Sequence, residues 1–404
     1  MQQKIIQAGS ACITRLEQAG FSAFFVGGCV RDLLLNRGIN DVDVATSARP
    51  EQVMGLFEHA IPTGLSHGTV TVLIHSIPVE VTTYRRESEY TDHRHPDSVF
   101  FVDHIEEDLA RRDFTMNALA MNLQGEKVDP FHGVVDLEHK ILRGVGDPVT
   151  RFKEDPLRML RGIRFAVQLD FTIDENTYKG MKECAPSIKY IAMERILAEW
   201  NKALMSKAPE RALWMLYDTN LYTFIPGLNP IVQGWTTFQE QTQHVKELPI
   251  LAQRLAYLFL KGNLAGQALP IMKSLKYDRK TMDQVKQLIE IVGRLQKKRN
   301  EKVLLETFMA FNGELGLHGA AISDLLEVEP ILQKAIHVYN KMKVKQLRDL
   351  AVKGDELVAS LQRTPGAWIH QVLTELSLEV NLGLLPNEKK SLIERAKKIH
   401  YDTT

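Results

Sequence analysis

The fold of the N-terminal part is decided by residues 24–44, which contain Phe24-Phe25-Val26-Gly27-Gly28-Cys29-Val30-Arg31-Asp32 and then Asp41-Val42-Asp43-Val44. The apolar run predicts a short buried strand, the glycine pair a tight turn, and residues 30–36 a helix that ends before Gly38. A second strand is then expected to carry the two aspartates. Because side chains alternate along a strand, both acids should share one face while the valines face a core.

The two aspartates are candidate metal ligands. Side chains two residues apart on a strand are about 7 Å apart, and two carboxylates at that spacing can hold hard cations. The glycine pair lets backbone N–H groups approach an anion closely, and the following helix adds the positive end of its dipole. We therefore expect phosphate and metal to meet at one place.

Each of these features has a simpler explanation when it is taken alone. An alternating pattern of acids and valines is typical of a half-exposed strand, and Gly-Gly is common in turns. Arg31 and a third carboxylate, Glu80 in the similar setting Val79-Glu80-Val81, favour the catalytic interpretation of the combined pattern.

Length and composition restrict the class of protein. With 404 residues, the chain is too long for one hydrophobic core and predicts two to four folded units. Hydrophobic residues make up 44% of the chain and charged residues 25%, and Lys+Arg equal Asp+Glu at 50 each. No global basic charge marks a nucleic-acid-binding protein, so any such surface must come from segregated charge.

The cysteines and the N-terminus predict a cytoplasmic protein. Cys12, Cys29 and Cys184 are odd in number, scattered and without the spacing of a metal site, as is typical of reduced thiols. The N-terminus lacks a long apolar segment after a basic start, and no run of about eighteen apolar residues occurs. We therefore expect neither export nor membrane insertion.

The remaining patterns predict an α+β fold with a small α/β head followed by a long helical part. Further strands are expected at 69–77, 79–84 and 141–145, with a break at Pro78. Helices of the head are expected at 4–19, 47–57 and 105–121. From about residue 149 the strand patterns nearly vanish, and helices separated by Pro and Gly follow, beginning with 149–168 and with breaks near 226–230 and 297–302.

Residues 85–98 are expected to form a mobile loop beside the site, because these polar and charged residues cannot bury a core. The loop contains His93, His95 and Asp97, which could be mistaken for a metal site. No strand or helix would hold these ligands in register, so we favour a surface loop over a zinc site.

A row of charged residues marks the helix expected at 149–168. Asp155, Arg158, Arg161 and Arg164 follow one another at intervals of three, which on a helix makes a slanted ridge about 13 Å long. Most such rows are solvated faces. Apolar residues flank this row on both sides, which favours a ridge wedged between two domains.

An aspartate and an arginine from this row could read a nucleobase. A carboxylate accepts hydrogen bonds and a guanidinium only donates them. Cytosine and adenine present an amino donor beside a ring-nitrogen acceptor, whereas guanine and uracil present a carbonyl beside an N–H. One Asp/Arg pair would therefore suit C and A and oppose G and U. The later arginines would hold this pair in place or reach a triphosphate.

Four motifs follow one another within residues 20–165: Gly27-Gly28-x-x-Arg31-Asp32, Asp41-x-Asp43, Arg111-Arg112-Asp113-x-x-x-Asn117 and Glu154-Asp155-x-x-Arg158-x-x-Arg161-x-x-Arg164-Phe165. They resemble the ordered motifs of class II CCA-adding enzymes, which are tRNA nucleotidyltransferases of the polymerase-β superfamily. The resemblance implies a polymerase-β-type catalytic head at 1–148 followed by an elongated all-α part. That part would comprise a base-selecting neck at 149–220, a body at 221–300 and a tRNA-binding tail at 301–404.

The resemblance also implies a role for each site residue. It assigns Asp41 and Asp43 to two Mg²⁺ ions and makes Glu80 the third catalytic carboxylate. The other positions would bind the nucleotide: Gly28 and Arg31 its phosphates, Arg112 the nucleotide itself, Asp113 and Asn117 near its ribose, Asp155 and Arg158 its base, and Arg161 and Arg164 to complete the base pocket. Residues 85–98 would match the loop that helps to switch specificity from C to A, and residues 191–204 a neck motif. No His-Asp pair occurs in the C-terminal half, so an appended phosphohydrolase domain is not expected.

The implied reaction is the stepwise addition of C, C and A to the 3′ end of tRNA from CTP and ATP, without a nucleic-acid template and with release of pyrophosphate. Basic clusters at 297–299, 341–348 and 389–398 are candidates for contacts with tRNA phosphates, although each is equally typical of a solvated helix face. A poly(A) polymerase, or a relative that adds only C or only A, shares nearly all these motifs and is the nearest alternative. A non-catalytic RNA-binding protein that kept the fold is the alternative from another class, and a homodimer is left open.

Overall fold

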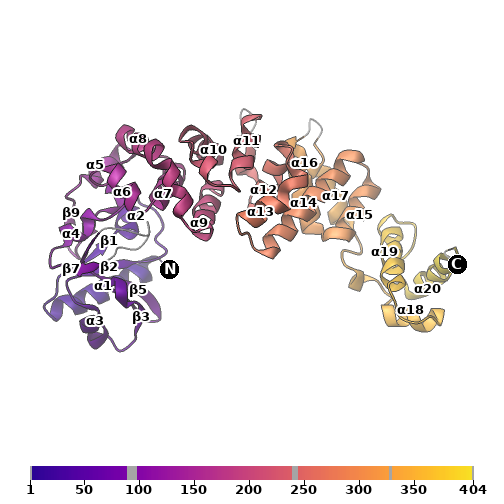
Figure 1. Cartoon of the computed structure of the whole chain (residues 1–404). Helices are drawn as coiled ribbons and strands as arrows, with labels where there is room; N and C mark the ends of the chain where they lie inside the picture. Colours follow the sequence, from indigo (N-terminus) through magenta and orange to yellow (C-terminus); the bar gives the residue numbers. More distant parts are fainter. Residues whose placement is uncertain (1, 89–97, 239–243, 327–329, 403–404) are drawn as a thin grey trace. The chain divides into compact units, whose positions relative to one another are not determined.

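The computed structural model describes residues 2–88, 98–238, 244–326 and 330–402, and the chain divides into two compact units, residues 1–232 and 233–404. The first unit combines a mixed sheet with helices, and the described part of the second is helical, as the α+β prediction requires (Figure 1). The division at residue 232 does not test the finer neck, body and tail boundaries, which stay predictions. No helix in the described residues is long and apolar enough to cross a membrane.

The strands in the described residues all lie in the first unit. They are β1 Ala23–Val26, β2 Asp43–Thr46, β3 Ala60–Gly64, β4 Thr69–Ile74, β5 Ile77–Thr83, β6 Arg85–Glu87, β7 Val99–Phe101, β8 Ala120–Met121, β9 Lys127–Val128, β10 Ile141–Leu142 and β11 Thr172–Ile173. Seven of them form one sheet in the order β3-β4-β5-β2-β1-β8-β9, while β6–β7 and β10–β11 are separate pairs. In the large sheet β2 and β5 run parallel, and its other neighbours are antiparallel.

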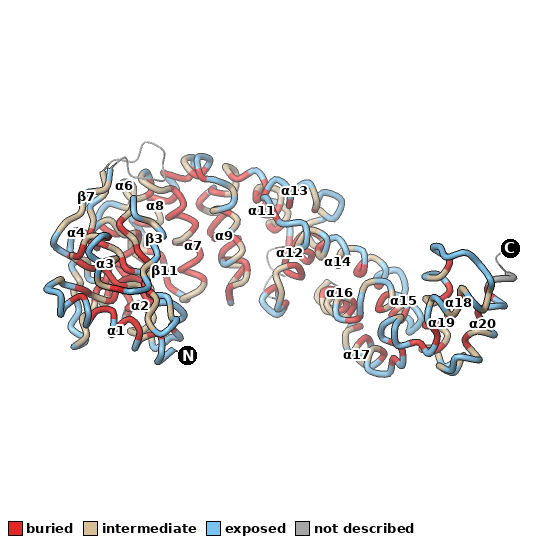
Figure 2. Tube along the Cα trace, turned by 90° about the horizontal axis from the view of Figure 1, so that it is seen from below, coloured by how far each residue is buried: buried red, intermediate tan, exposed pale blue. Residues whose placement is uncertain are grey.

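The helices of the first unit are α1 Gln2–Gln18, α2 Gly28–Leu34, α3 Pro50–Leu56, α4 Ile105–Ala110, α5 Gly133–Glu138, α6 Pro148–Glu154, α7 Leu157–Leu169, α8 Glu175–Cys184, α9 Met193–Leu204 and α10 Pro209–Asp218. Short 3₁₀ turns, among them η2 Thr115–Asn117, connect them. Figure 2 shows α7 largely in the colour of buried residues, and ten of its thirteen residues are buried.

Different helices cover the two faces of the large sheet. On one face α1 approaches so closely at Gly9 that a Cβ atom there would lie 2.5 Å from Cε1 of Phe25. On the other face α4 packs in a cluster that includes Val26, Ala45 and Tyr84. Because side chains alternate along a strand, Asp43 shares the α4 face with Ala45. Its register partner across the parallel strands is Glu80, which lies on the same face as Tyr84.

Three predicted elements of the head have different boundaries in the structure. β2 begins at Asp43, so Asp41 lies just before the strand. Pro78 lies inside β5, opposite Leu73, and the break predicted there falls instead at His75 and Ser76, whose φ angles of 49° and 65° form the hairpin turn. The strand predicted at 141–145 covers only β10.

The prediction of one helix over 105–121 was wrong. α4 ends at Ala110, and the chain then forms η2 and β8, which pairs with β1. The periodicity of apolar residues was correct, but Arg111 pairs with Glu87 and Asp113 with Arg161, both far along the chain, and these contacts replace a continuous helix.

The helix predicted over 149–168 is two helices. α6 ends at Glu154 and α7 begins at Leu157, because a proline ring at position 156 cannot continue the hydrogen bonding of α6. Asp155 therefore lies between the helices and not on a ridge with the arginines. Arg158, Arg161 and Arg164 do lie on α7, and Arg158 and Arg164 are each 8% exposed, so this row is not a solvated face.

The segment predicted as a loop, residues 85–98, begins with β6, which pairs with β7 in an antiparallel ribbon from Arg85↔Phe101 to Glu87↔Val99. His93, His95 and Asp97 lie outside the described residues.

The second unit contains α12 Leu251–Lys261, α13 Ala268–Ser274, α14 Arg279–Lys297, α15 Glu301–Phe311, α16 Gly313–Leu326, α17 Leu332–Lys341, α18 Gly354–Leu361, α19 Trp368–Asn381 and α20 Lys389–Asp402, while α11 Asn229–Thr236 contains the boundary between the units. The predicted breaks near 226–230 and 297–302 fall before α11 and between α14 and α15.

Close helix packing in the second unit depends on glycines of α16. Gly313, Gly316 and Gly319 are spaced by three, and a Cβ atom at each would overlap Tyr339, Phe308 and Ile291, respectively. α16 therefore lies against α17, α15 and α14 at distances that only a missing side chain allows. A separate cluster around Leu357, Leu376 and Leu392 joins α18, α19 and α20.

Candidate active site

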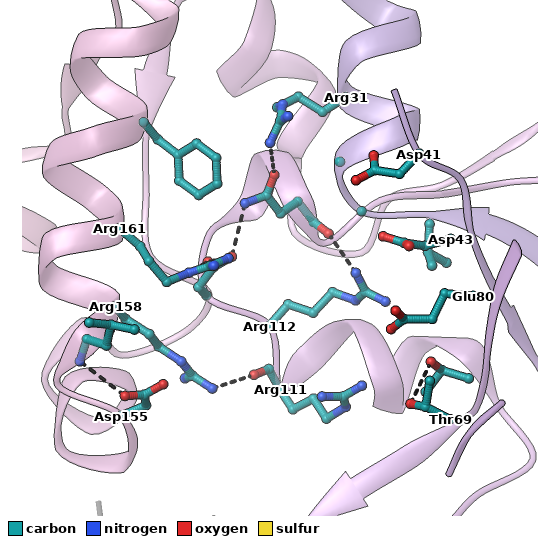
Figure 3. A pocket seen from close by; sticks show the side chains of 18 of the residues that line it. Arg31, Asp41, Asp43, Thr69, Glu80, Arg111, Arg112, Asp155, Arg158 and Arg161 are labelled. Atoms are coloured by element: carbon teal, nitrogen blue, oxygen red, sulfur yellow. Dashed lines mark hydrogen bonds and ion pairs between the residues drawn. The ribbon is translucent and has the colours of Figure 1, made fainter. Parts of the chain in front are cut away.

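One cavity of about 560 Å³ in the first unit brings together all twelve predicted site residues (Figure 3). They are Gly28, Arg31, Asp41, Asp43, Glu80, Arg112, Asp113, Asn117, Asp155, Arg158, Arg161 and Arg164. In all, eight arginines and six carboxylates line this cavity. The excess of arginine suits an anionic ligand, and the carboxylates provide ligands for cations.

The acidic end of the cavity is built on neighbouring strands. Asp43 begins β2 and is the register partner of Glu80 on β5, and Figure 3 shows both with Asp41 on the same side of the cavity. Burial, and repulsion from Glu80 and Asp41, raise the pKa of Asp43 to about 6 although Arg112 acts in the opposite direction. A cation bound between these carboxylates would remove that repulsion.

The donors at this end fit a hard divalent cation, because all are carboxylate oxygens. Among the residues that the structure describes, no three His, Cys, Asp or Glu side chains already form a complete metal-binding group.

The glycine turn lets an arginine approach the backbone. Gly27 has φ 68°, a conformation that L-residues rarely adopt, and a Cβ atom there would lie 2.7 Å from Nη1 of Arg112. Arg112 Nη1 also donates to the carbonyl of Asn117 at 3.4 Å. The guanidinium of Arg112 therefore lies directly against the turn that precedes α2.

A chain of hydrogen bonds crosses the middle of the cavity. Arg31 Nη1 donates to Asn117 Oδ1 at 2.7 Å, and Asn117 Nδ2 donates to Asp113 Oδ1 at 3.1 Å. Asp113 Oδ2 accepts from Arg161 Nε at 2.8 Å and Nη2 at 2.6 Å. Burial opposes ionisation of Asp113, but Arg161 and Asn117 outweigh it and lower its pKa to about 2. This chain links α2, η2 and α7 and keeps Asp113 charged.

Asp155 and Arg158, the two predicted base-reading residues, are held by separate partners. Asp155 Oδ2 accepts from Arg195 Nη2 at 2.8 Å. Arg158 donates from Nη1 to Glu154 Oε2 at 2.8 Å and from Nη2 to the carbonyl of Arg111 at 3.0 Å. Because Asp155 lies in the break between α6 and α7, α9 supplies its partner. Both side chains still line the cavity.

Arg164 is held by α9 as well. It forms an ion pair with the buried Glu199 and donates to Gln168 Oε1 at 2.8 Å. Its guanidinium lies 3.8 Å from the centre of the Phe165 ring, which Arg31 and Arg161 also approach at 5.2 and 5.5 Å. Arg164 therefore supports the pocket wall through α9 and Phe165 in addition to lining the cavity.

Sequence reasoning missed further lining residues, chiefly Arg195, Arg111, Arg85, Asp32, Thr69, Thr82 and Phe165. For Arg195 a signal was present. Arg195 and Glu199 are four residues apart within the segment singled out as a neck motif, so they share a face of α9, and this face contacts both Asp155 and Arg164. Nothing in the local sequence identified these two distant partners.

Three family models match separate parts of the chain. The model of the poly A polymerase head domain matches residues 23–143. The model described as a probable RNA and SrmB binding site of polymerase A matches residues 170–232, and that of tRNA nucleotidyltransferase domain 2 matches residues 251–396. The cavity draws most of its residues from the first of these matches.

Proteins similar over the full length of the chain identify its family more specifically than these three models do. The CCA-adding enzyme of Limosilactobacillus reuteri (strain DSM 20016) is 39% identical over 98% of this chain and 97% of that protein. The CCA-adding enzyme of Enterococcus faecalis (strain ATCC 700802 / V583) is 37% identical over 96% and 94%. Among solved structures, the Bacillus stearothermophilus CCA-adding enzyme in complex with CTP is 31% identical, covers 98% of both chains and has a TM-score of 0.85.

Proposed function

The chain belongs to the CCA-adding enzymes, and from that premise we propose how its cavity adds C, C and A to the 3′ end of tRNA from CTP and ATP. The observation that carries this proposal is that the acidic end and the base-reading end, far apart in the sequence, line one cavity. Transfer and base choice can then act on one nucleotide. The tRNA 3′-hydroxyl attacks the α-phosphorus, and pyrophosphate leaves in line.

Nucleotidyltransferases of this family use a divalent metal, and we propose that it is Mg²⁺ here, held by Asp41 and Asp43 with Glu80 as the third carboxylate. The raised pKa of Asp43 supports this assignment, because repelling carboxylates are the arrangement that a cation stabilises. When bound, two such ions would lower the pKa of the attacking hydroxyl and neutralise charge on the leaving pyrophosphate. The protein residues fix where the α-phosphorus can lie.

We propose that Gly28, Arg31 and Arg112 bind the triphosphate and that Asp113 and Asn117 hold the ribose side. The position of Arg112 against the glycine turn supports the first part, because guanidinium and backbone N–H donors converge there. The chain from Arg31 through Asn117 to Asp113 supports the second, because it fixes the amide and carboxylate orientations before a nucleotide binds.

We propose that Asp155 and Arg158 read the base, while Arg161 and Arg164 complete the pocket. An ionised carboxylate accepts from the amino group that C and A share, and a guanidinium donates to their ring nitrogen. In the structure each reader is held by its own partner, Arg195 for Asp155 and Glu154 for Arg158. The protein would therefore supply the template as two preoriented side chains.

The helical residues beyond the head are proposed to bind tRNA through backbone phosphates, with neck, body and tail at 149–220, 221–300 and 301–404. The basic clusters at 297–299, 341–348 and 389–398 support contacts of the body and tail with these phosphates. A cytoplasmic location and assembly as a homodimer remain proposals that rest on the sequence. Sedimentation of the purified protein would test whether it is a homodimer.

The direct test is incubation of the purified protein with Mg²⁺ and a tRNA that ends at the discriminator base, with CTP, ATP or both. We expect two C additions with CTP alone and, with both nucleotides, one further A followed by a halt. A long A tail would instead identify a poly(A) polymerase. No incorporation with any nucleotide would favour the RNA-binding alternative.

A further inference from the structure

A buried carboxylate outside the cavity holds two of its arginines. Asp108 lies on α4 with an exposed fraction of 0% and does not line the cavity. Its Oδ1 accepts from Arg111 Nη2 at 2.8 Å and Nε at 3.0 Å, and its Oδ2 accepts from Arg112 Nη2 at 3.1 Å and Nε at 3.4 Å. We call these three residues the Asp108 clamp.

The Asp108 clamp packs against the large sheet, which also carries the acidic end of the cavity. Ile105 and Leu109, on either side of Asp108 in α4, are buried in the cluster that contains Ala45 of β2. Asp43 begins that strand and lies on the same face. The backbone N–H of Arg85, where β6 begins, also donates to Asp108 Oδ1 at 3.4 Å. The carboxylate therefore has a fixed position relative to the catalytic strands.

The two arginines of the clamp reach opposite ends of the cavity. Arg112 lies against the glycine turn with its Nη1 edge, while its Nη2 and Nε edge faces Asp108. Arg111 presents its main-chain carbonyl to Nη2 of Arg158 at 3.0 Å. Asp108 thus fixes Arg112 on the phosphate side and, through the end of α4, Arg158 on the base side.

The charge of Asp108 is maintained by its partners. Burial disfavours ionisation, but Arg111 and Arg112 outweigh it and keep the pKa of Asp108 below its usual value. The carboxylate is therefore ionised at neutral pH. Replacing it with a neutral amide would leave two partly buried guanidinium groups without their shared charged acceptor.

We propose that Asp108 is a positioning residue for the incoming nucleotide, because it aims Arg112 along the glycine turn and holds the carbonyl that orients Arg158. The proposal rests on the proposed function above. Asp108 acts through its two arginines and touches no substrate, so its removal should change nucleotide affinity more than the rate of transfer from bound nucleotide.

The test is a double-mutant cycle on the full-length protein, with CTP and ATP dissociation constants measured by calorimetry for Asp108→Asn, Arg112→Ala and the double variant. We expect Asp108→Asn to weaken both nucleotides at least tenfold. The double variant should lose clearly less affinity than the product of the two single effects, because the part of the effect of Asp108 that passes through Arg112 is already lost in Arg112→Ala. Effects that multiply in the double variant would overturn the proposal.

A matched control separates positioning from general stability. Asp136 on α5 is also a buried carboxylate, accepting from Thr115 Oγ1 at 2.7 Å and from Arg143, but it does not line the cavity. Asp136→Asn should lower the unfolding midpoint and leave CTP affinity unchanged. Equal loss of affinity in both Asn variants would count against a specific role of Asp108. Should Asp108→Asn fail to fold, Asp108→Glu with Asp136→Glu gives the same contrast with the charge retained.

The outcome is distinguishable from failure of the proposed function. Wild-type protein is assayed in parallel for CTP binding and for C, C, A addition. If wild type adds C, C and A but Asp108→Asn keeps full CTP affinity, only the positioning role is wrong. If wild type neither binds CTP nor extends tRNA, the proposed function itself fails and the positioning role fails with it.

Discussion

At the scale of single residues, the chemistry of this protein depends on which charges are compensated and which are not. Asp113 is stabilised by Arg161 and Asn117, and Asp108 by two arginines, so both stay ionised. Asp43 is the opposite case, since burial and its neighbours Glu80 and Asp41 raise its pKa. A bound cation stabilises the ionised form of such an uncompensated carboxylate more than that of a carboxylate already paired with arginines.

The pKa of Asp43 predicts how pH changes metal binding. Because a proton and a cation compete for the same carboxylate, we expect affinity for Mg²⁺ or Mn²⁺ to be constant above about pH 6 and to fall by about tenfold per pH unit below it. Calorimetric titration with Mn²⁺ between pH 5 and pH 8 measures this. A flat profile over the whole range would contradict the assignment of Asp43 as a ligand.

The same shift predicts an effect on stability with the opposite sign. The pKa of Asp43 is raised in the folded protein, so protonation stabilises the metal-free fold; this contribution is complete below pH 3.8 and is lost as pH rises through about 6. Asp43→Asn should therefore raise the unfolding midpoint of metal-free protein at pH 8 and leave it nearly unchanged at pH 4. Thermal unfolding in the presence of a chelator would detect the difference.

Replacing Asp155 should relax base choice without abolishing transfer. Asp155→Ala removes the proposed acceptor for the amino group of C and A but none of the acidic residues that would hold the metal, so discrimination against UTP and GTP should fall by about 1–3 kcal/mol, which is roughly 5- to 150-fold. The ratios of kcat/KM for the four nucleotides measure this. Glu175→Ala, at a carboxylate with an 81% exposed side chain, is the control. Unchanged discrimination in Asp155→Ala would contradict the base-reading role of Asp155.

At the scale of secondary-structure elements, the sequence predicted where helices and strands lie better than which distant residues pair. The strand, turn and helix at 23–34, the acidic strand and the helices after 149 were predictable because their apolar periodicity is local. The ends of α4 and α6 were not predictable in the same way. At the end of α4, Arg111 bonds to the distant Glu87 instead of continuing the helix, and at the end of α6, Pro156 interrupts the hydrogen bonding. The Asp155 and Arg195 ion pair joins residues 40 positions apart, and no local pattern encodes such a pairing.

The glycines of α16 give a prediction at this scale. A Cβ atom on Gly319 would overlap Ile291 of α14, so Gly319→Ala should destabilise the protein by about 1–3 kcal/mol. Gly293 on α14 has nothing within 4 Å of the same position, so Gly293→Ala should stabilise by about 0.5–1 kcal/mol through helix propensity. Denaturant unfolding of the two variants provides the comparison. Equal effects in both would show that α14 and α16 are not closely packed at Gly319.

At the scale of the whole molecule, the two units divide the work that the proposed function requires. Every residue that lines the cavity lies between Val26 and Arg195, within the first unit. The basic cluster of α20 lies in the second. Nucleotide affinity and tRNA affinity should therefore respond to separate sets of substitutions.

Neutralising α20 tests this separation. Lys390, Lys397 and Lys398 are exposed, and their joint replacement by Gln should raise the KM for tRNA several-fold. The slope of log affinity against log salt should fall by about one unit for each tRNA phosphate that the variant no longer binds. CTP affinity is the internal control and should not change. An unaltered salt slope would exclude this cluster from the tRNA interface.

The placement of the cavity also has a consequence for biosynthesis. Since translation proceeds from the N-terminus, the segment ending at Arg195 leaves the ribosome before any helix from α12 to α20 has been made. A nascent chain can thus complete its nucleotide pocket while the later helices are still untranslated, so CTP and ATP can act as ligands that favour folding of the emerging first half.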